Sequence, residues 1–552
     1  MRTPFALALL GPLGVLACSS TDTEPGLGGS GQGAAGNGGS SMTTGGGTSG
    51  GASAKGGSSG SSGASGGSGG SSGGATGGSG ATSGTSGSAG ATANGGTTSN
   101  GGTSAGGAGT SAGGAGTSST GGNGAMSGGG GTSAGGAVGS CPGSCTAAPA
   151  GSCTAPEVRI TTVNIGASLS YSQDETAAIP LAIAAKPGGG SRLAWVTGYS
   201  RYGSSTASQV HVGELDCDDA LTGTPFTLEG HDFQDLAADG DGGVIVVTRD
   251  GAGTDEQHCG DVNNLCILPS DRPGCYDTYM VRYDCAGQTQ WSTKLTSSDA
   301  TNPGYTSGGG QNMFVWWYQH HGRIAYDGTN YAAYFCDAIT VTNDQCENGA
   351  GKVDIHEGDR MQVVGPDGAL VKGHDSFGLG CSHSWTTRIV WDARTSHFVM
   401  TCATDNDCRI AQPNPYRTIA AGECDGTLFG GDVVNAGDAG YWTAWSQGGV
   451  IRLEHFSTGA SDKTVMTAGT TKYPHLVAYG ANHMLLTWGS GSGLAAQIYD
   501  STSGEPVGDQ FSIAVPDAPW QSWKAFPDGS VAWASVSSAS SMVNVARVMP
   551  CE

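Results

Sequence analysis

Short runs of alternating apolar and polar residues recur along the chain from Leu181 onward. Such alternation is typical of β-strands with one buried face. The clearest stretch runs from Arg323 to Lys372 and reads RIAYDGTNYAAYF, then an insertion, then RMQVVGPDGALVK. Each half contains a tight turn, at Asp327-Gly328 and at Pro366-Asp367-Gly368. We therefore expect four antiparallel strands, a unit that buries too little surface to be stable alone.

The first half of this unit recurs along the chain, which indicates a repeat architecture. Further copies begin at Leu181, Asp235, Arg388, Asp432, His475 and Lys524. Second halves follow several of them as QVHVGELD, YMVRYDCAGQTQW, VIRLEHFSTG and AAQIYDSTSGEPVG. The shortest spacings between copies match the ~40 to 50 residues of a four-stranded propeller blade. We therefore predict an all-β domain that folds as a seven-bladed β-propeller.

The last copy ends at VNVARVMP and lacks an outer strand. An early strand, EVRITTVNI from Glu157, is expected to supply it and to close the ring, because closure hides the exposed edges of the sheets. A six-bladed ring and a β-sandwich are the alternatives, since the second half of the Arg388 copy (CRIAQPNPYRTIAAGEC) has no clear strand pattern.

Residues 1–18 have the layout of a secretory signal, with one basic residue and an apolar run too short for an ordinary transmembrane helix. The sequence Val15-Leu16-Ala17-Cys18 resembles the lipobox of bacterial lipoproteins. The resemblance implies signal cleavage before Cys18 and acylation of Cys18, which anchors the chain in a membrane. Ser19 at the next position resembles lipoproteins sorted to the outer membrane. A plain secretory signal is the alternative.

Residues 19–140 are almost entirely Gly, Ser, Thr and Ala. Such a tract cannot repay the entropy of ordering it, so we predict a disordered linker. A flexible coil of roughly 120 residues has an end-to-end distance of ~60 Å, which would hold a folded domain at 141–552 away from the membrane. The anchor and linker together resemble those of bacterial surface lipoproteins, and the resemblance implies exposure at the cell surface.

The formal net charge of −23 falls on the folded domain, because 141–552 hold 21 of the 23 basic and 44 of the 46 acidic residues. This acidity argues against nucleic acid as a partner and against tight binding to anionic lipid. It also disfavours polyanionic substrates.

Fifteen of the sixteen cysteines lie between Cys141 and Cys551. In an exported chain they are expected to form disulfides, with at least one left over because the number is odd. Cys551 is placed to tie the ring closure to Cys141, Cys145 or Cys153. Zinc is the competing reading of these cysteines, but no paired CxxC motif is present.

Nearly half of the twelve histidines cluster near the third and fourth predicted blades. They are His320, His321, His356, His374 and His383. Each falls in a predicted connection between blades or between the second and third strands of a blade. Such connections emerge on one face of a propeller. We therefore expect all five on one rim, together with Glu357, Asp359, Asp375 and Trp385.

This rim offers several kinds of chemistry. Imidazoles supported by carboxylates suit a Zn, Mn or Cu ion, with His320, His321, His374 and His383 as candidate ligands. A histidine beside Tyr318, Arg323 or Arg360 is also suited to proton transfer. The aromatic run Trp316, Trp317 and Tyr318 is suited to stacking on sugar rings. The structural alternative is that these side chains hydrogen-bond or pack between blades.

The copy that starts at Asp235 contains DGGVIVVT and VRYDCAGQTQW. It resembles β-propeller repeats in which an Asp-Gly turn precedes a Tyr-Asp-x-x-Gly-x-x-x-Trp strand pair, and this implies a fold but no reaction. Neither a G-x-S-x-G nor an HExxH motif is present. We favour a tethered binding module that holds a glycan or a protein partner on the rim. The alternatives are a polysaccharide lyase or metal-assisted hydrolase on the same rim, and a structural envelope protein.

Overall fold

The computed structural model describes the folded part of the chain with some gaps. The described residues are 145, 150–169, 181–198, 209–228, 233–249, 275–276, 278–296, 312–315, 322–343, 352–371, 373–378, 380–381, 384–404, 408–469, 474–518, 521–537, 539 and 541–551. The chain divides into two units, Met1–Gly113 and Gly114–Glu552, and all described residues belong to the second. The expected signal peptide with Cys18 and the expected linker 19–140 lie outside them. Within the described ranges, no helix has the length and apolarity needed to cross a membrane.

The described strands form seven antiparallel sheets, which we number as blades 1 to 7 in chain order. Blade 1 consists of β2 (Leu181–Ala185), β3 (Ser191–Thr197), β4 (Gln209–Leu215) and β5 (Leu221–Leu228). Blade 2 consists of β6 (Asp235–Ala238), β7 (Val244–Arg249), β9 (Thr278–Tyr283) and β10 (Thr289–Lys294). Blade 3 consists of β12 (Arg323–Tyr326), β13 (Tyr331–Asn343) and β14 (Lys352–Val364), and β8 (Cys275–Tyr276) and β11 (Asn312–Val315) are attached to it.

Blades 4 to 7 follow the same order. Blade 4 consists of β15 (Ser384–Asp392), β16 (His397–Thr404), β17 (Arg409–Pro413) and β18 (Tyr416–Ala421), and blade 5 of β19 (Phe429–Asn435), β20 (Tyr441–Gln447), β21 (Val450–Phe456) and β22 (Lys463–Ala468). Blade 6 consists of β23 (His475–Tyr479), β24 (His483–Ser490), β25 (Gly493–Asp500) and β26 (Pro506–Ile513). Blade 7 consists of β27 (Lys524–Ala525), β28 (Val531–Val536), β29 (Met542–Val548) and β1 (Val158–Asn164). A short 3-10 helix, η5 (Gly437–Ala439), lies in the turn after β19.

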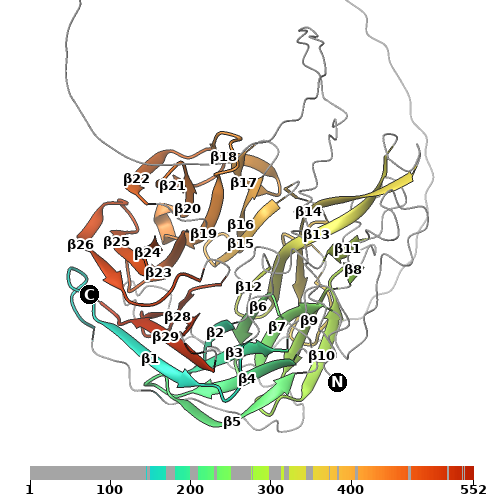
Figure 1. Cartoon of the computed structure of the whole chain (residues 1–552). Coiled ribbons are helices and arrows are strands. Elements are labelled where there is room, and N and C mark those ends of the chain that lie inside the picture. Colours follow the sequence, from blue (N-terminus) through green and yellow to red (C-terminus); the bar gives the residue numbers. More distant parts are fainter. Residues whose placement is uncertain are drawn as a thin grey trace, which may run out of the picture. The chain divides into compact units, whose positions relative to one another are not determined.

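The innermost strands of the blades meet in a closed ring. Strands β2, β6, β12, β15, β19, β23 and β27 each contact the next one in this order, and β27 contacts β2 (Figure 1). The domain is therefore a seven-bladed β-propeller, as the repeats predict. The six-bladed alternative is wrong because CRIAQPNPYRTIAAGEC forms β17 and β18, the two outer strands of blade 4.

The hydrophobic core lies between neighbouring blades. Alternate residues of one strand serve two different interfaces: Val244 and Val246 of β7 pack against blade 1, whereas Ile245 and Val247 pack against blade 3. Because both faces of a blade are buried, its middle strands read as nearly continuous apolar runs. Tryptophans near the ends of second strands belong to this core, since Trp195, Trp445, Trp488 and Trp533 are at most 3% exposed.

The ring closes with strands from both ends of the domain. β1 pairs with β29 from Val158↔Val548 to Asn164↔Met542, which confirms that the early strand completes the last blade. A disulfide joins Cys153 to Cys551, one of the three pairings expected from the sequence. Further disulfides join Cys145 to Cys217, Cys381 to Cys402 and Cys408 to Cys424.

Candidate functional site

Blade 3 carries more strand than the repeat requires, because β13 and β14 continue past the innermost strand. β12 pairs with β13 only as far as Arg323↔Tyr334, but the pairing of β13 with β14 continues to Asn343↔Lys352. β11 pairs with this continuation, and β8 pairs with β11 (Figure 1). We call β8, β11, Phe335–Asn343 and Lys352–Arg360 the accessory sheet.

The accessory sheet brings together three separate interruptions of the repeat. β8 lies between the second and third strands of blade 2, β11 lies in the connection from blade 2 to blade 3, and the third piece lies between the second and third strands of blade 3. These segments are far apart in sequence, yet Asn312 of β11 lies opposite Ile339, which in turn lies opposite His356. The insertions therefore form one structure and are not independent loops.

The register shows on which end of the blade this sheet lies. Arg323 is the first residue of β12, and the accessory part of β13 begins directly beyond its partner Tyr334. The accessory sheet therefore extends from the end of blade 3 where the innermost strand begins.

A group of ionisable residues lies along the innermost strands. Four of them are the first residues of β6, β12, β23 and β27, and the other two are the fifth residue of β15 and the fourth of β19. The axial ring, as we call it, consists of Asp235, Arg323, Arg388, Asp432, His475 and Lys524. Lys524 Nζ donates to both carboxylate oxygens of Asp235, at 2.8 and 2.9 Å. This pair joins blade 7 to blade 2 past blade 1, so it lies close to the axis. Asp235 also accepts from the backbone N–H of Ile324 in blade 3, at 2.9 Å.

Asp432 joins blades 4, 5 and 6 within the ring. Its carboxylate accepts from Arg388 Nε at 2.5 Å and lies 3.1 Å from Nδ1 of His475. Burial alone would raise the pKa of Asp432, but the positive charge of Arg388 and the hydrogen bond with His475 hold it well below its ordinary value. Asp432 is therefore a permanent anion inside the ring.

Arg323 is the member of the ring that the sequence singled out. Burial, with the charge of Arg388 beside it, lowers the pKa of the Arg323 guanidinium to about 9, against the opposite effect of Asp235 and Asp432. The guanidinium still carries its charge at neutral pH. Its Nη1 donates to the carbonyl oxygen of Gly322 at 2.7 Å.

His475 and Gln234 are buried residues of this region whose side chains have polar atoms without a hydrogen-bond partner among the described residues. Nε2 of His475 is one such atom, on a ring that stacks against Trp523 at 4.6 Å. Both amide atoms of Gln234, the residue before Asp235, are the others. His475 is 1% exposed and Gln234 is fully buried. Buried groups of this kind are normally matched by water or a ligand, so the ring is suited to holding a small polar group.

Many of the rim residues expected from the sequence lie outside the described part of the chain. Trp316, Trp317, Tyr318, His320, His321 and His383 are outside it altogether. His356, Glu357 and Trp385 are placed by their backbone alone: the first two lie within β14, opposite Ile339 and Ala338, and the third lies in β15. His356 and Glu357 thus belong to the accessory sheet and not to a loop, because β13 and β14 are longer than the repeat suggests.

Asp359 and Arg360 are fully buried and not part of an exposed rim. Asp359 accepts a hydrogen bond from the hydroxyl of Tyr334 and faces the Cys381–Cys402 disulfide between blades 3 and 4. Burial raises the pKa of its carboxyl to about 8, although this hydrogen bond and backbone N–H groups act in the opposite direction.

His374 and Asp375 lie at the other end of blade 3. Nε2 of His374 is 2.6 Å from Asp327, in the turn that follows the last residue of β12, and Asp375 binds the start of β16 through His397 and the N–H of Phe398. After Gly368 the chain turns back along β14. Both residues precede Phe377, which bonds with Met361 at the level of Arg323, so they lie nearer to the end of blade 3 that carries Asp327. They are therefore not on the shared rim that the sequence predicts.

Two groups among the described residues have side-chain atoms close enough to hold a metal ion. They are Asp359 with Cys381 and Cys402, and His483 with Cys153 and Cys551. In both groups the two cysteines are joined by a disulfide, which removes the thiolates that a metal ion would need.

The sequence contained a signal for the axial ring that the rim hypothesis did not use. Six of the seven copies of the repeat begin with an ionisable residue that belongs to the ring, and only the Leu181 copy does not. A charge at one aligned position of several copies points to a shared place near the axis, since the innermost strands meet there.

No protein-family model and no curated protein matches this chain. Among solved structures, it is similar to the WD40 domain of coronin from Toxoplasma gondii, with 9% identity, a TM-score of 0.38 and coverage of 74% of this chain and 90% of that one. It is also similar to the Pan2 WD40 domain of Neurospora crassa, with 10% identity, a TM-score of 0.35 and coverage of 71% and 96%. For the quinohemoprotein alcohol dehydrogenase of Comamonas testosteroni the identity is 9% and the TM-score 0.32, with coverage of 72% of this chain and 77% of that one. Similarity at this level says nothing about activity or partners.

Proposed function

We propose that the protein is a binding module tethered to the bacterial outer membrane through Cys18, which holds a glycan or a protein partner at the cell surface. The binding face is the end of the propeller that carries the accessory sheet and the axial ring. Nucleic acid is not the partner, because the folded domain carries the net charge of −23.

The accessory sheet is the observation that carries this proposal. A propeller closes without it, since every blade already has its inner strands and the core lies between the blades. Three insertions nevertheless pair with one another on one side of blades 2 and 3. Loops positioned by a rigid scaffold are where binding residues concentrate. The aromatic run Trp316-Trp317-Tyr318 follows β11 directly in the sequence and leads to Arg323.

The test is to remove the accessory sheet and to measure binding. In one variant a two-residue turn replaces residues 337–358, and in a matched control a two-residue insertion lengthens the β24–β25 turn at Gly491. Full-length protein and both variants are applied to a glycan array, and intact cells are cross-linked and analysed by mass spectrometry. We expect glycan binding or partner cross-links at this face, lost only in the shortened variant. Equal binding by all three proteins would refute the proposal.

The tether is tested separately. Replacement of Cys18 by Ala should move the protein from the detergent phase to the aqueous phase on Triton X-114 partitioning, because the acylated cysteine is the proposed anchor. An unchanged distribution would contradict the lipoprotein assignment without bearing on the binding face.

Catalysis with a metal ion is the alternative that remains for the histidines outside the described residues. Metal analysis of the purified protein and of a His320→Ala/His383→Ala variant distinguishes this metal-dependent enzyme from the binding module. A near-stoichiometric transition metal that disappears in the variant would favour a metal-assisted lyase or hydrolase, whereas its absence after reconstitution would leave the binding module.

A further inference from the structure

Two disulfides precede the first strand on the path from the linker into the propeller. Cys145 is bonded to Cys217 in the β4–β5 turn of blade 1, and its N–H donates to the carbonyl of Gly188 in the β2–β3 turn at 2.9 Å. Cys153 is bonded to Cys551, and Gly151 beside it donates to the carbonyl of Pro550 at 2.8 Å. A side chain at Gly189 would overlap Cys145, so the first attachment is closely fitted.

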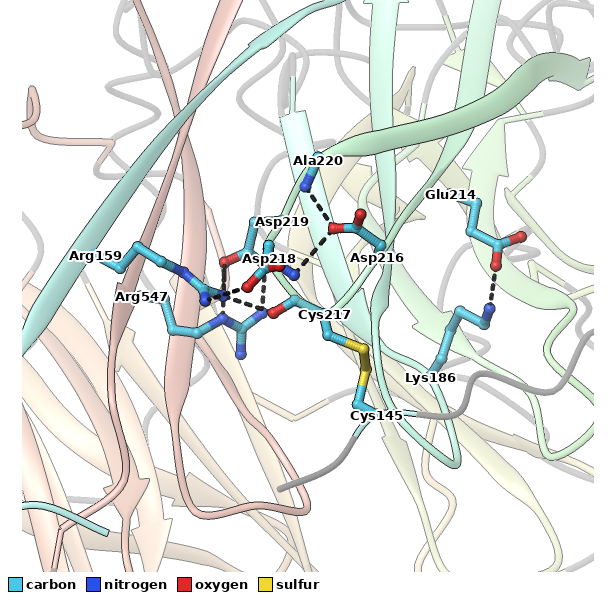
Figure 2. Close-up of a disulfide and its surroundings, with 10 residues drawn as sticks. All are labelled: Cys145, Arg159, Lys186, Glu214, Asp216, Cys217, Asp218, Asp219, Ala220 and Arg547. Carbon is cyan, nitrogen blue, oxygen red and sulfur yellow. Dashed lines mark hydrogen bonds and ion pairs between the residues drawn. A yellow bond between two sulfur atoms is a disulfide. The ribbon is translucent and has the colours of Figure 1, made fainter. Parts of the chain in front are cut away.

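The turn that receives Cys145 is itself held to blade 7. Asp219, two residues after Cys217, is fully buried and accepts from both Nε and Nη2 of Arg547 in β29, at 2.9 and 2.6 Å (Figure 2). Arg159 of β1 donates to the same carboxylate at 2.7 Å and to the carbonyl of Cys217 at 2.8 Å. The anchor point is therefore shared by the first and last blades.

The same turn is also fixed internally. The carboxylate of Asp216 accepts from the N–H groups of Asp218 and Ala220, both at 2.9 Å (Figure 2). At the base of the neighbouring β2–β3 turn, Lys186 is 1% exposed and its ammonium lies 2.6 Å from Glu214 of β4. The β4–β5 turn, on which a force applied at Cys217 would act, is therefore held by its own hydrogen bonds and lies beside a turn held by an ion pair.

We propose that this closure clamp, made of the two disulfides and the Asp219 ion pairs, carries the mechanical load of the tether. This inference rests on the proposed anchoring through Cys18. β1 is the outermost strand of blade 7, pairs among the described strands with β29, and has one buried residue, Val163. Without the clamp, tension from the linker would act directly on the end of β1 and peel it from β29. With the clamp, covalent bonds take the load before β1, first into blade 1 and then into the C-terminus.

The experiment is single-molecule pulling between the N-terminus of the full chain and a ligation tag inserted in the β24–β25 turn at Gly491. A variant without both disulfides (Cys145→Ala, Cys153→Ala, Cys217→Ala and Cys551→Ala) should show an early low-force step of roughly 60 to 70 Å, the contour of residues 145–164 at ~3.5 Å each. The oxidised wild type should lack this step, and so should variants without one pair, because the other pair still precedes β1.

A Cys408→Ala/Cys424→Ala variant, which removes a disulfide of blade 4, is the matched control and should behave as wild type. If the four-cysteine variant does not fold, wild type pulled in buffer with and without a reductant gives the same comparison. The same early step at the same force in oxidised wild type would overturn the proposal. Because the protein is pulled without its lipid, failure here is distinct from failure of the Cys18→Ala partitioning test.

Discussion

The carboxyl group of Asp359 links the stability of the domain to pH. It is fully buried beside Tyr334 and the Cys381–Cys402 disulfide. Since burial raises its pKa to about 8, the folded protein keeps a proton that the unfolded chain releases near pH 4. The stabilising contribution of this proton is complete below about pH 4 and is lost as the pH rises to about 8.

Replacement of Asp359 by Asn should remove this dependence. At pH 4 the variant and wild type should unfold with similar free energies, and at pH 8.5 the variant should be more stable by about 2 to 5 kcal/mol. Urea denaturation followed by tryptophan fluorescence measures the difference, with Asp509→Asn, an exposed position, as the control. A constant difference between variant and wild type across this range would show that Asp359 is ionised when buried.

The ion pair of Arg388 with Asp432 is a second prediction at the residue scale. Asp432→Asn leaves the Arg388 guanidinium, 3% exposed, without its anion, and we expect a loss of about 3 to 5 kcal/mol in unfolding free energy. The double variant Asp432→Asn/Arg388→Met should recover much of this loss, because it removes the buried charge as well. Denaturant unfolding of the four proteins of the cycle gives the coupling energy. Additive effects would mean that the two side chains do not depend on each other.

The chemistry of single residues was the least predictable from sequence. His374 and Asp359 stood in motifs that suggested ligands, but one contacts Asp327 in a turn and the other is sealed between blades. Sequence spacing does not reveal which end of a strand a side chain occupies when the following segment turns back. The axial ring depends on closure, which brings Lys524 to Asp235 across 289 residues.

At the scale of elements, the innermost strands β6 and β15 each connect two sets of inter-blade contacts. Asp239 and Asp392 lie four residues after the ring members Asp235 and Arg388. Each accepts a hydrogen bond from the hydroxyl of the first residue in the second strand of the next blade, Tyr331 or Tyr441. These bonds hold neighbouring blades together at the end opposite the axial ring.

The variants Tyr331→Phe and Tyr441→Phe test these contacts. Each should lower the unfolding free energy by about 1 to 2 kcal/mol, because a buried hydrogen bond to a charged group is lost while the ring still packs. Tyr416→Phe is the matched control, since Tyr416 is 45% exposed in β18. Thermal denaturation ranks the three, and losses no larger than that of the control would show that the blades do not need these bonds.

Strands with strong alternation could be predicted, and the accessory sheet could not. The patterns that start at Asp235 and His475 predict β6, β7, β23 and β24, because burial of both faces imposes apolar residues. β8 and β11 have two and four residues, and their partners come from other insertions. Pairing between short segments that are distant in sequence leaves no periodic signal in any one of them.

For the whole molecule, the sequence indicated both the number of blades and the closure. The evidence was the count of repeats, together with one missing strand at the C-terminus and one unassigned strand near Glu157. Of the three cysteines proposed to meet Cys551, the structure selects Cys153, which precedes β1 by five residues, whereas Cys145 is bonded to blade 1. Spacing alone could not decide between them, because all three precede the same strand.

The closing strand should decide whether the domain is a stable monomer. Removal of residues 1–140 leaves β1 and both clamp disulfides intact, so we expect a monomer with an unchanged unfolding transition. Removal of 1–164 deletes β1 and exposes the edge of β29 along seven residues, a template for pairing with a second copy. We therefore expect self-association and a lower transition temperature, measured by light scattering after size exclusion and by calorimetry.

A Cys153→Ser/Cys551→Ser variant of the 141–552 protein separates the contribution of the disulfide from that of the strand. This variant should remain monomeric, because the edge of β29 stays covered. Self-association of this variant to the same extent would assign the closure to the disulfide and not to the strand.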